Sequence, residues 1–164
     1  MGIYINKGNA EFRDIVTHEY VDKSSLIPLI NDTLTSEFRY SCVTRCRRFG
    51  KSMAAKMLCA YYDKSCDSRE LFRGLKAEQG ITFETHLNKY YVICVDMTDF
   101  TTRFRHEKEI VKIIQDKIIN EILTEFPQIK RQDDDDLMEI LYRISESTGE
   151  RFFMIIDEWD AILR

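Results

Sequence analysis

The chain has 164 residues, of which 44% are hydrophobic and 32% charged, and its net charge is −4 at pH 7. A chain of this length forms one domain that buries roughly 70% of the surface its unfolded form exposes, and its low proline and glycine content excludes disordered and collagen-like classes. The acidic balance argues against a protein dedicated to coating nucleic acid, but it leaves room for a local basic patch.

The five cysteines form an odd set with no C-x-x-C pair, so neither a disulfide framework nor a zinc site is indicated. The N-terminus holds no apolar stretch of signal-peptide length, and no window approaches the roughly 18 apolar residues of a membrane span. We therefore expect a cytoplasmic protein with reduced thiols and no membrane partner.

Residues 1–36 are predicted to form an N-terminal helical segment. The first helix of this segment falls within residues 8–19. The second is capped by Ser24 or Ser25 and tolerates Pro28 in its first turn. Its apolar residues recur at helical spacing: Leu26, Ile27, Leu29, Ile30 and Leu34. Between the two helices, Asp22 and Lys23 are typical of a solvated turn when judged on residue chemistry alone.

Residues 38–53 run from an apolar segment through a basic loop into a helix. Tyr40 to Thr44 is a short β-prone run, which predicts a strand. After the loop, apolar residues at i, i+3 and i+4 spacing predict an amphipathic helix: Met53, Ala54, Met57, Leu58 and Tyr61. The start of such a helix directs its N–H groups and positive dipole end at an anion.

Gly50-Lys51-Ser52 matches the end of the phosphate-binding pattern G-x-x-x-x-G-K-[ST]. In that pattern backbone N–H groups wrap a phosphate, the lysine reaches its outer oxygens and the hydroxyl binds Mg²⁺. Arg45 stands where the pattern has its first glycine. The predicted nucleotide contacts are Arg45, Cys46, Arg47, Arg48, Phe49, Gly50, Lys51, Ser52 and Met53.

A polar break at residues 63–67 is followed by a predicted short helix that Ser68 caps and Gly74 ends. Residues 75–87 fit neither a helix nor a strand pattern clearly. Residues 90–97 are almost all apolar and aromatic, which predicts a second, buried strand. Asp96 and Asp99 would lie at its carboxyl end, the edge of the sheet where α/β proteins bind ligands.

A long helix is predicted over residues 106–126, where isoleucines recur at helical spacing until Pro127 stops it. Four aspartates, at 133–136, precede a further helix that Gly149 closes. We interpret them as capping and solvation rather than a calcium site, because the alternating ligands and glycine of an EF-hand are absent. Residues 151–158 then form an apolar run that ends in Asp157 and Glu158, which predicts a third strand.

Strands separated by helical crossovers predict an α/β fold with a parallel sheet, here an incomplete P-loop NTPase core of the ASCE/AAA-like type. The chemistry expected of it is Mg-dependent ATP binding and hydrolysis. Lys51 would contact the β- and γ-phosphates, Ser52 and Asp157 would hold Mg²⁺, and Glu158 would polarise the attacking water.

An alternative function uses the same basic loop, Arg45 to Lys51, as a non-catalytic contact for nucleic acid or phosphate. Phe49 would then stack on a base, whereas in the ATPase it is expected to pack the loop against the sheet.

Four motifs in order resemble the AAA-ATPase-like family of bacterial P-loop proteins. They are Tyr20-Val21-Asp22-Lys23, Arg47-Arg48-Phe49-Gly50-Lys51-Ser52, Leu71-Phe72 with Gly74-Leu75, and Ile155-Ile156-Asp157-Glu158-Trp159-Asp160. The resemblance covers nearly the whole chain. It implies that residues 20–23 lie beside the nucleotide site. In that family the P-loop domain is often joined to a C-terminal nuclease-like domain of the PD-(D/E)XK type, which makes such a domain a possible part of the parent chain. Family members commonly have arginine at position 45, while Cys46 replaces a usual proline and Trp159 a usual tyrosine.

Residues 37–164 would then be the N-terminal part of an ATPase domain, truncated after the acidic motif. In related ATPases the next strand inserts between the acidic strand and the P-loop strand, and it is not present. We expect these 164 residues to bind nucleotide weakly, to lack hydrolysis and to self-associate through exposed strand edges, with hydrolysis belonging to the full-length protein.

Overall fold

The structure is a computed structural model that describes residues 2–18, 20–44, 46, 48–104, 109–133 and 135–163. The chain divides into two compact units, one of residues 8–90 and one of residues 1–7 with 91–164. This division follows packing. The segments 1–36 and 37–164 expected from the sequence were defined by motifs, and they stay a prediction.

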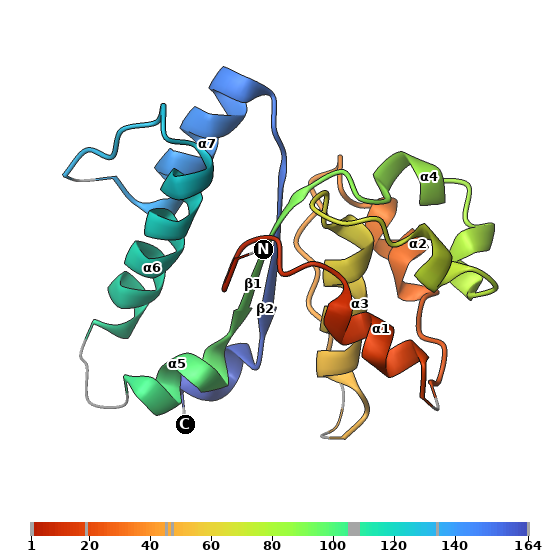
Figure 1. The fold of residues 1–164 in the computed structure, drawn as a ribbon. Helices are drawn as coiled ribbons and strands as arrows, with labels where there is room; N and C mark the ends of the chain where they lie inside the picture. Colours follow the sequence, from red (N-terminus) through yellow and green to blue (C-terminus); the bar gives the residue numbers. More distant parts are fainter. Residues whose placement is uncertain are drawn as a thin grey trace. The chain divides into compact units, whose positions relative to one another are not determined.

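The unit of residues 8–90 is helical. Its elements are α1 (Ala10–Val16), α2 (Leu26–Asn31), α3 (Lys51–Tyr62), the 3-10 turns η1 (Arg69–Phe72) and η2 (Lys76–Gln79), and α4 (Phe83–His86). Figure 1 shows them in red to green along the chain. The ambiguous residues 75–87 therefore form a 3-10 turn and a single short helix.

The second half of α3 is the core of this unit. The predicted helix is present, and all six residues from Met57 to Tyr62 are buried, so burial here extends beyond the predicted apolar face to every side of the helix. The rings of Tyr61 and Phe72 pack edge to face with centroids 5.5 Å apart, and Phe72 stacks on Phe12 at 5.2 Å. Aromatic packing therefore holds α3 in place.

The buried tyrosine hydroxyls of α3 have hydrogen-bond partners. Tyr61 donates to the carbonyl of Phe83 at 2.7 Å and accepts from the amide of Asn31 at 3.0 Å. Tyr62 donates to Asn31 Oδ1 at 2.7 Å. Burial raises the pKa of Tyr61 to about 12, so its hydroxyl remains a donor at physiological pH.

The strand predicted at Tyr40–Thr44 does not form. Residues 39–44 lie outside helices and strands, and the side chain of Tyr40 is 80% exposed. β-prone residues make a strand only where a neighbouring strand can accept their backbone hydrogen bonds, and the described part of the chain offers none here.

The other unit contains β1 (Tyr91–Asp96), α5 (Met97–Arg103), α6 (Ile110–Glu125), α7 (Leu137–Thr148), β2 (Phe152–Asp157) and the 3-10 turn η3 (Trp159–Leu163). The two strands pair in parallel, in a register that runs from Tyr91 with Phe152 to Asp96 with Asp157. Two of the three expected strands are therefore present as a small parallel sheet, as in an incomplete α/β domain.

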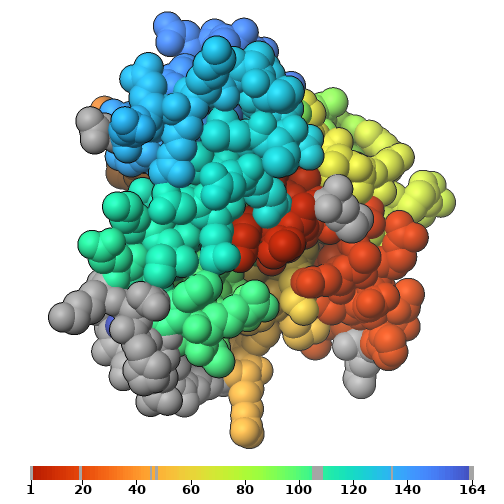
Figure 2. Space-filling view, turned by 60° about the vertical axis from the view of Figure 1, so that its left-hand side comes forward, coloured from red at the N-terminus to blue at the C-terminus, as the bar shows by residue number. Residues whose placement is uncertain are grey.

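Residues 4–6 close the outer edge of β1. Cys94 donates its N–H to the carbonyl of Tyr4 and Asn6 donates to that of Val92, both at 2.8 Å. The Glu121 carboxylate on α6 accepts the N–H groups of Tyr4 and Ile5 at 3.0 and 2.9 Å, and Figure 2 shows the N-terminal residues (red) against α6 (cyan).

Helices α6 and α7 lie side by side next to the two strands (Figure 1). Ile118, Ile122 and Ile140 are among the side chains that they bury with β1 in one core. Gly149 ends α7 in the left-handed conformation, as expected. Among the described residues, no helix combines the length and the apolar character that crossing a membrane requires.

The aspartates before α7 divide their roles. Asp136 caps the helix, accepting the N–H of Glu139 at 2.9 Å in a capping box. The Arg143 guanidinium hydrogen-bonds to Asp135 at 2.6 Å and holds the pKa of that carboxyl below its ordinary value. Asp134 lies outside the described residues.

Candidate nucleotide site

The segment of residues 20–24 is fixed by hydrogen bonds rather than solvated. The Asp22 carboxylate accepts the N–H of Ser24 at 2.8 Å and, with its other oxygen, the N–H of Lys76 at 2.9 Å. The Ser24 hydroxyl accepts the N–H of Ala77 at 2.9 Å. The side chains of Asp22 and Ser24 thus hold the start of η2, whose residues lie 54 and 53 positions later in the sequence.

Tyr20 fixes the same segment to the core. Its ring meets Phe12 edge to face with centroids 5.6 Å apart. Its hydroxyl accepts the N–H of Lys23 at 3.3 Å and donates to the Met57 sulfur at 3.3 Å. With Tyr20 and Asp22 engaged in this way, Lys23 is the member of the motif that is directed at the basic loop.

Lys23 reaches the end of that loop. Its Nζ donates to the carbonyl oxygen of Phe49. A Cβ added at Gly50 would lie 2.6 Å from the same Nζ, so a larger residue would displace the ammonium group, and the φ of 72° at this position also favours glycine. The two motifs, which are separated by 26 positions in the sequence, are therefore in direct contact.

The loop enters α3 through two residues with positive φ. Arg48 has φ of 67°, where a residue other than glycine costs about 1 kcal/mol or more, and Gly50 has φ of 72° as the N-cap. The Gly50 carbonyl accepts the N–H of Ala54 at 3.0 Å, which is the first bond of the helix. The predicted helix start at Gly50-Lys51-Ser52 is therefore present.

The loop side chains differ in exposure. Lys51 and Met53 are half-buried, while Cys46, Arg48 and Ser52 are exposed. The Phe49 ring is 63% exposed, and the sheet against which it was expected to pack belongs to the other unit, so that packing stays a prediction. The predicted contacts Arg45 and Arg47 lie outside the described residues.

The acidic pair belongs to the other unit, at the carboxyl end of β2. Asp157 is half-buried and accepts the N–H of Glu158 at 3.0 Å, while Glu158 adopts φ of 50°. Asp96, opposite Asp157 in the sheet register, caps α5 by accepting the N–H of Thr98 at 2.8 Å. Because the strands pair in parallel, their carboxyl ends lie at the same edge of the sheet, and each end carries a carboxylate.

The comparisons with known proteins agree with the motifs. A sequence model of one family, described as a predicted AAA-ATPase, matches residues 7–164. The chain belongs to the AAA-ATPase-like family. This membership indicates an ATP-related function. Neither a curated protein nor a solved structure matches the chain.

Sequence reasoning missed the contact between Lys23 and the loop. No local pattern encodes a contact over 26 positions, and the family motif around Asp22 was the only available signal. It also missed a hollow that adjoins the loop, whose lining residues come from α1, α3 and the residues after α1.

We predict that Asp22→Asn loosens η2, because the amide retains one acceptor but directs a donor at the second N–H group. The loss at pH 7 should be about 1 kcal/mol in the free energy of unfolding, measured by urea denaturation. Burial raises the pKa of Asp22, but the hydrogen bonds from Ser24 and Lys76 outweigh it and hold the pKa below its ordinary value of 3.8. The carboxylate therefore stabilises the fold above about pH 4, and this contribution falls as the pH drops further.

The difference between parent and variant should accordingly shrink towards pH 3. The exposed Asp32, changed to Asn, is the matched control and should show little loss at either pH. A difference that stayed constant from pH 7 to pH 3 would contradict the role of the Asp22 charge.

Proposed function

We propose that this chain binds Mg·ATP at the start of α3 and that the intact protein hydrolyses it. The observation that carries the proposal is the contact between Lys23 and the Phe49 carbonyl beside Gly50. This contact sets a second ammonium group near the start of the helix that follows Gly50-Lys51-Ser52. Two lysines and the N–H groups of a first helical turn form a cationic environment suited to a polyphosphate.

Mg²⁺ fits the donors available. The hydroxyl of Ser52 and the carboxylate of Asp157 are oxygen ligands of the kind that Mg²⁺ takes. Among the described residues, no group of three or more histidine, cysteine or acidic side chains could hold a metal ion. Mg²⁺ is usually held by one or two protein groups together with substrate phosphates and water. When bound, the metal supplies charge neutralisation along the phosphates.

In the proposed reaction, Lys51 holds the outer phosphates and Glu158 polarises the attacking water. Glu158 is half-buried and lies in a sparsely populated backbone region, since φ is 50°. Strained backbone of this kind clusters at functional sites because the surrounding structure must maintain it. These features support the role of Glu158, and mutation tests it.

Lys51→Ala should reduce the affinity for Mg·ATP by roughly a hundredfold, because charge-assisted hydrogen bonds to the phosphates are lost. Isothermal titration calorimetry on the 164-residue chain measures this change. Lys89→Ala, which removes an exposed lysine outside the loop, is the control and should bind like the parent. A Lys51→Ala variant that bound as tightly as the parent would show that the nucleotide does not use this loop.

Glu158→Gln in the intact protein should retain ATP binding and lose turnover by roughly 10²- to 10⁴-fold, since the amide can orient water but cannot accept its proton. Asp157→Ala should instead weaken the binding of Mg²⁺, so that a higher Mg²⁺ concentration is needed for half-maximal turnover. Phosphate release measures both effects. If Glu158→Gln hydrolysed ATP at the parental rate, the base would lie elsewhere, and Asp160 would be the next residue to test.

One observation favours the alternative function. The ring of Phe49 is 63% exposed beside the exposed Arg48, as a base-stacking platform would be. If the loop binds nucleic acid, Phe49→Ala should weaken the affinity for a single-stranded oligonucleotide by about tenfold or more, since stacking contributes about 1–3 kcal/mol per base. Fluorescence anisotropy measures this affinity. Binding of Mg·ATP without measurable oligonucleotide binding would exclude the alternative.

A further inference from the structure

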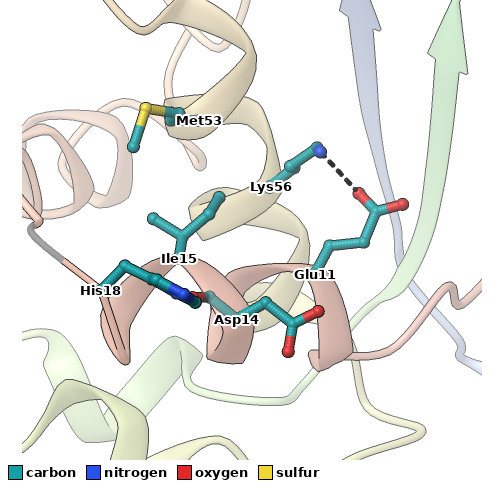
Figure 3. Close-up of a pocket in the computed structure, with 6 residues that line it drawn as sticks. All are labelled: Glu11, Asp14, Ile15, His18, Met53 and Lys56. Atoms are coloured by element: carbon teal, nitrogen blue, oxygen red, sulfur yellow. Dashed lines mark hydrogen bonds and ion pairs between the residues drawn. The ribbon is translucent and has the colours of Figure 1, made fainter.

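An open hollow lies between α1 and α3, within the unit of residues 8–90. Its volume is about 420 Å³, inside the range of about 300–1,000 Å³ that small-molecule pockets occupy. Figure 3 shows the side chains that line it: Glu11, Asp14, Ile15, His18, Met53 and Lys56. The first four come from α1 and the residues just after it, and the last two come from α3.

The hollow adjoins the loop at the start of α3. Met53 follows Ser52 directly, and the sulfur of Met53 lies 3.5 Å from the position of a Cβ added at Gly50. The same methionine side chain therefore faces the glycine of the phosphate motif and lines the hollow. A ligand whose phosphates lie at the start of α3 has this hollow next to it.

The charge of the rim disfavours the phosphates themselves. Glu11 pairs with Lys56 at 3.5 Å, which neutralises one carboxylate, and Asp14 contributes a further negative charge. An anionic group would be repelled by Asp14, whereas an uncharged ring would not. The hollow therefore suits the neutral end of a nucleotide.

The remaining groups suit a planar base. Ile15 and Met53 are half-buried apolar side chains, and a thioether makes favourable contacts with aromatic rings. His18 Nδ1 lies 2.7 Å from the carbonyl oxygen of Asp14. Because a carbonyl can only accept, the ring must donate from Nδ1, and a neutral ring then offers Nε2 as an acceptor for the amino group of a base.

We propose that this hollow binds the adenine base of the nucleotide, with Ile15 and Met53 against the ring and His18 at its amino group. The proposal rests on the proposed function, because the phosphates must lie at the start of α3. It adds a second part to the site, in which the base is recognised by residues outside the phosphate motif.

The first test compares Mg·ATP with magnesium tripolyphosphate, which has the phosphates but no base, by calorimetry on the 164-residue chain. ATP should bind at least tenfold more tightly. Equal affinities would overturn the inference and leave phosphate binding intact. If neither compound bound, the proposed function itself would fail.

The second test changes the hollow alone. Ile15→Ser should weaken ATP binding by about tenfold, the effect of losing part of one apolar contact, and leave tripolyphosphate binding unchanged. Ile81→Ser is the matched control, because Ile81 is fully exposed in the same unit and is not among the residues that line the hollow. Lys51→Ala should instead weaken the binding of both ATP and tripolyphosphate.

His18→Ala removes an exposed side chain. This variant tests whether the hollow binds the base if Ile15→Ser does not fold. It should reduce ATP affinity about threefold or more through the lost hydrogen bond, again without an effect on tripolyphosphate. ATP binding at the parental affinity in a folded Ile15→Ser variant, or in His18→Ala, would overturn the inference.

Discussion

The burial of the second half of α3 is the constraint on which the candidate site depends. Met57, Ala60, Tyr61 and Tyr62 are fully buried, and the two hydroxyls are satisfied by Asn31 and the Phe83 carbonyl. Sliding or rotating the helix would leave buried hydroxyls without partners, each at a cost of about 1–3 kcal/mol. The core therefore fixes one end of α3, and the other end presents Gly50, Lys51 and Ser52 at the surface.

The same core positions the residues around that end. Tyr20 packs on Phe12 and contacts Met57 of α3. The segment that carries Lys23 is therefore held in a fixed position relative to α3. Asp22 and Ser24 then prevent this segment from turning by holding η2. Lys23 is thus supported on both sides, which explains how a flexible side chain can be directed at one carbonyl of the loop.

Much of this arrangement could be predicted from the sequence, and what could not has physical reasons. The strands at Tyr91–Asp96 and Phe152–Asp157 were predicted because continuous apolar runs of this length favour buried strands whatever their neighbours. The run at Tyr40–Thr44 carries similar local propensity, but a strand depends on partners that propensity does not encode. Periodicity predicted the helix α3 but not the burial of every side of its second half, because that burial depends on the aromatic residues packed around it. The contact of Lys23 and the hollow beside Met53 depend on tertiary packing alone.

In the proposed complex, charge orients the nucleotide. The start of α3 favours anions, because Lys23, Lys51 and the positive end of the helix dipole all lie there. Further along the same helix, Lys56 forms an ion pair with Glu11. Asp14 then gives the rim of the hollow a negative charge. A polyphosphate and a neutral base have opposite preferences for these two surroundings, so a reversed nucleotide would set phosphates against a carboxylate and leave the lysines without anions. Because α3 contributes to both surroundings, the distance between them is set by the helix rather than by the loop.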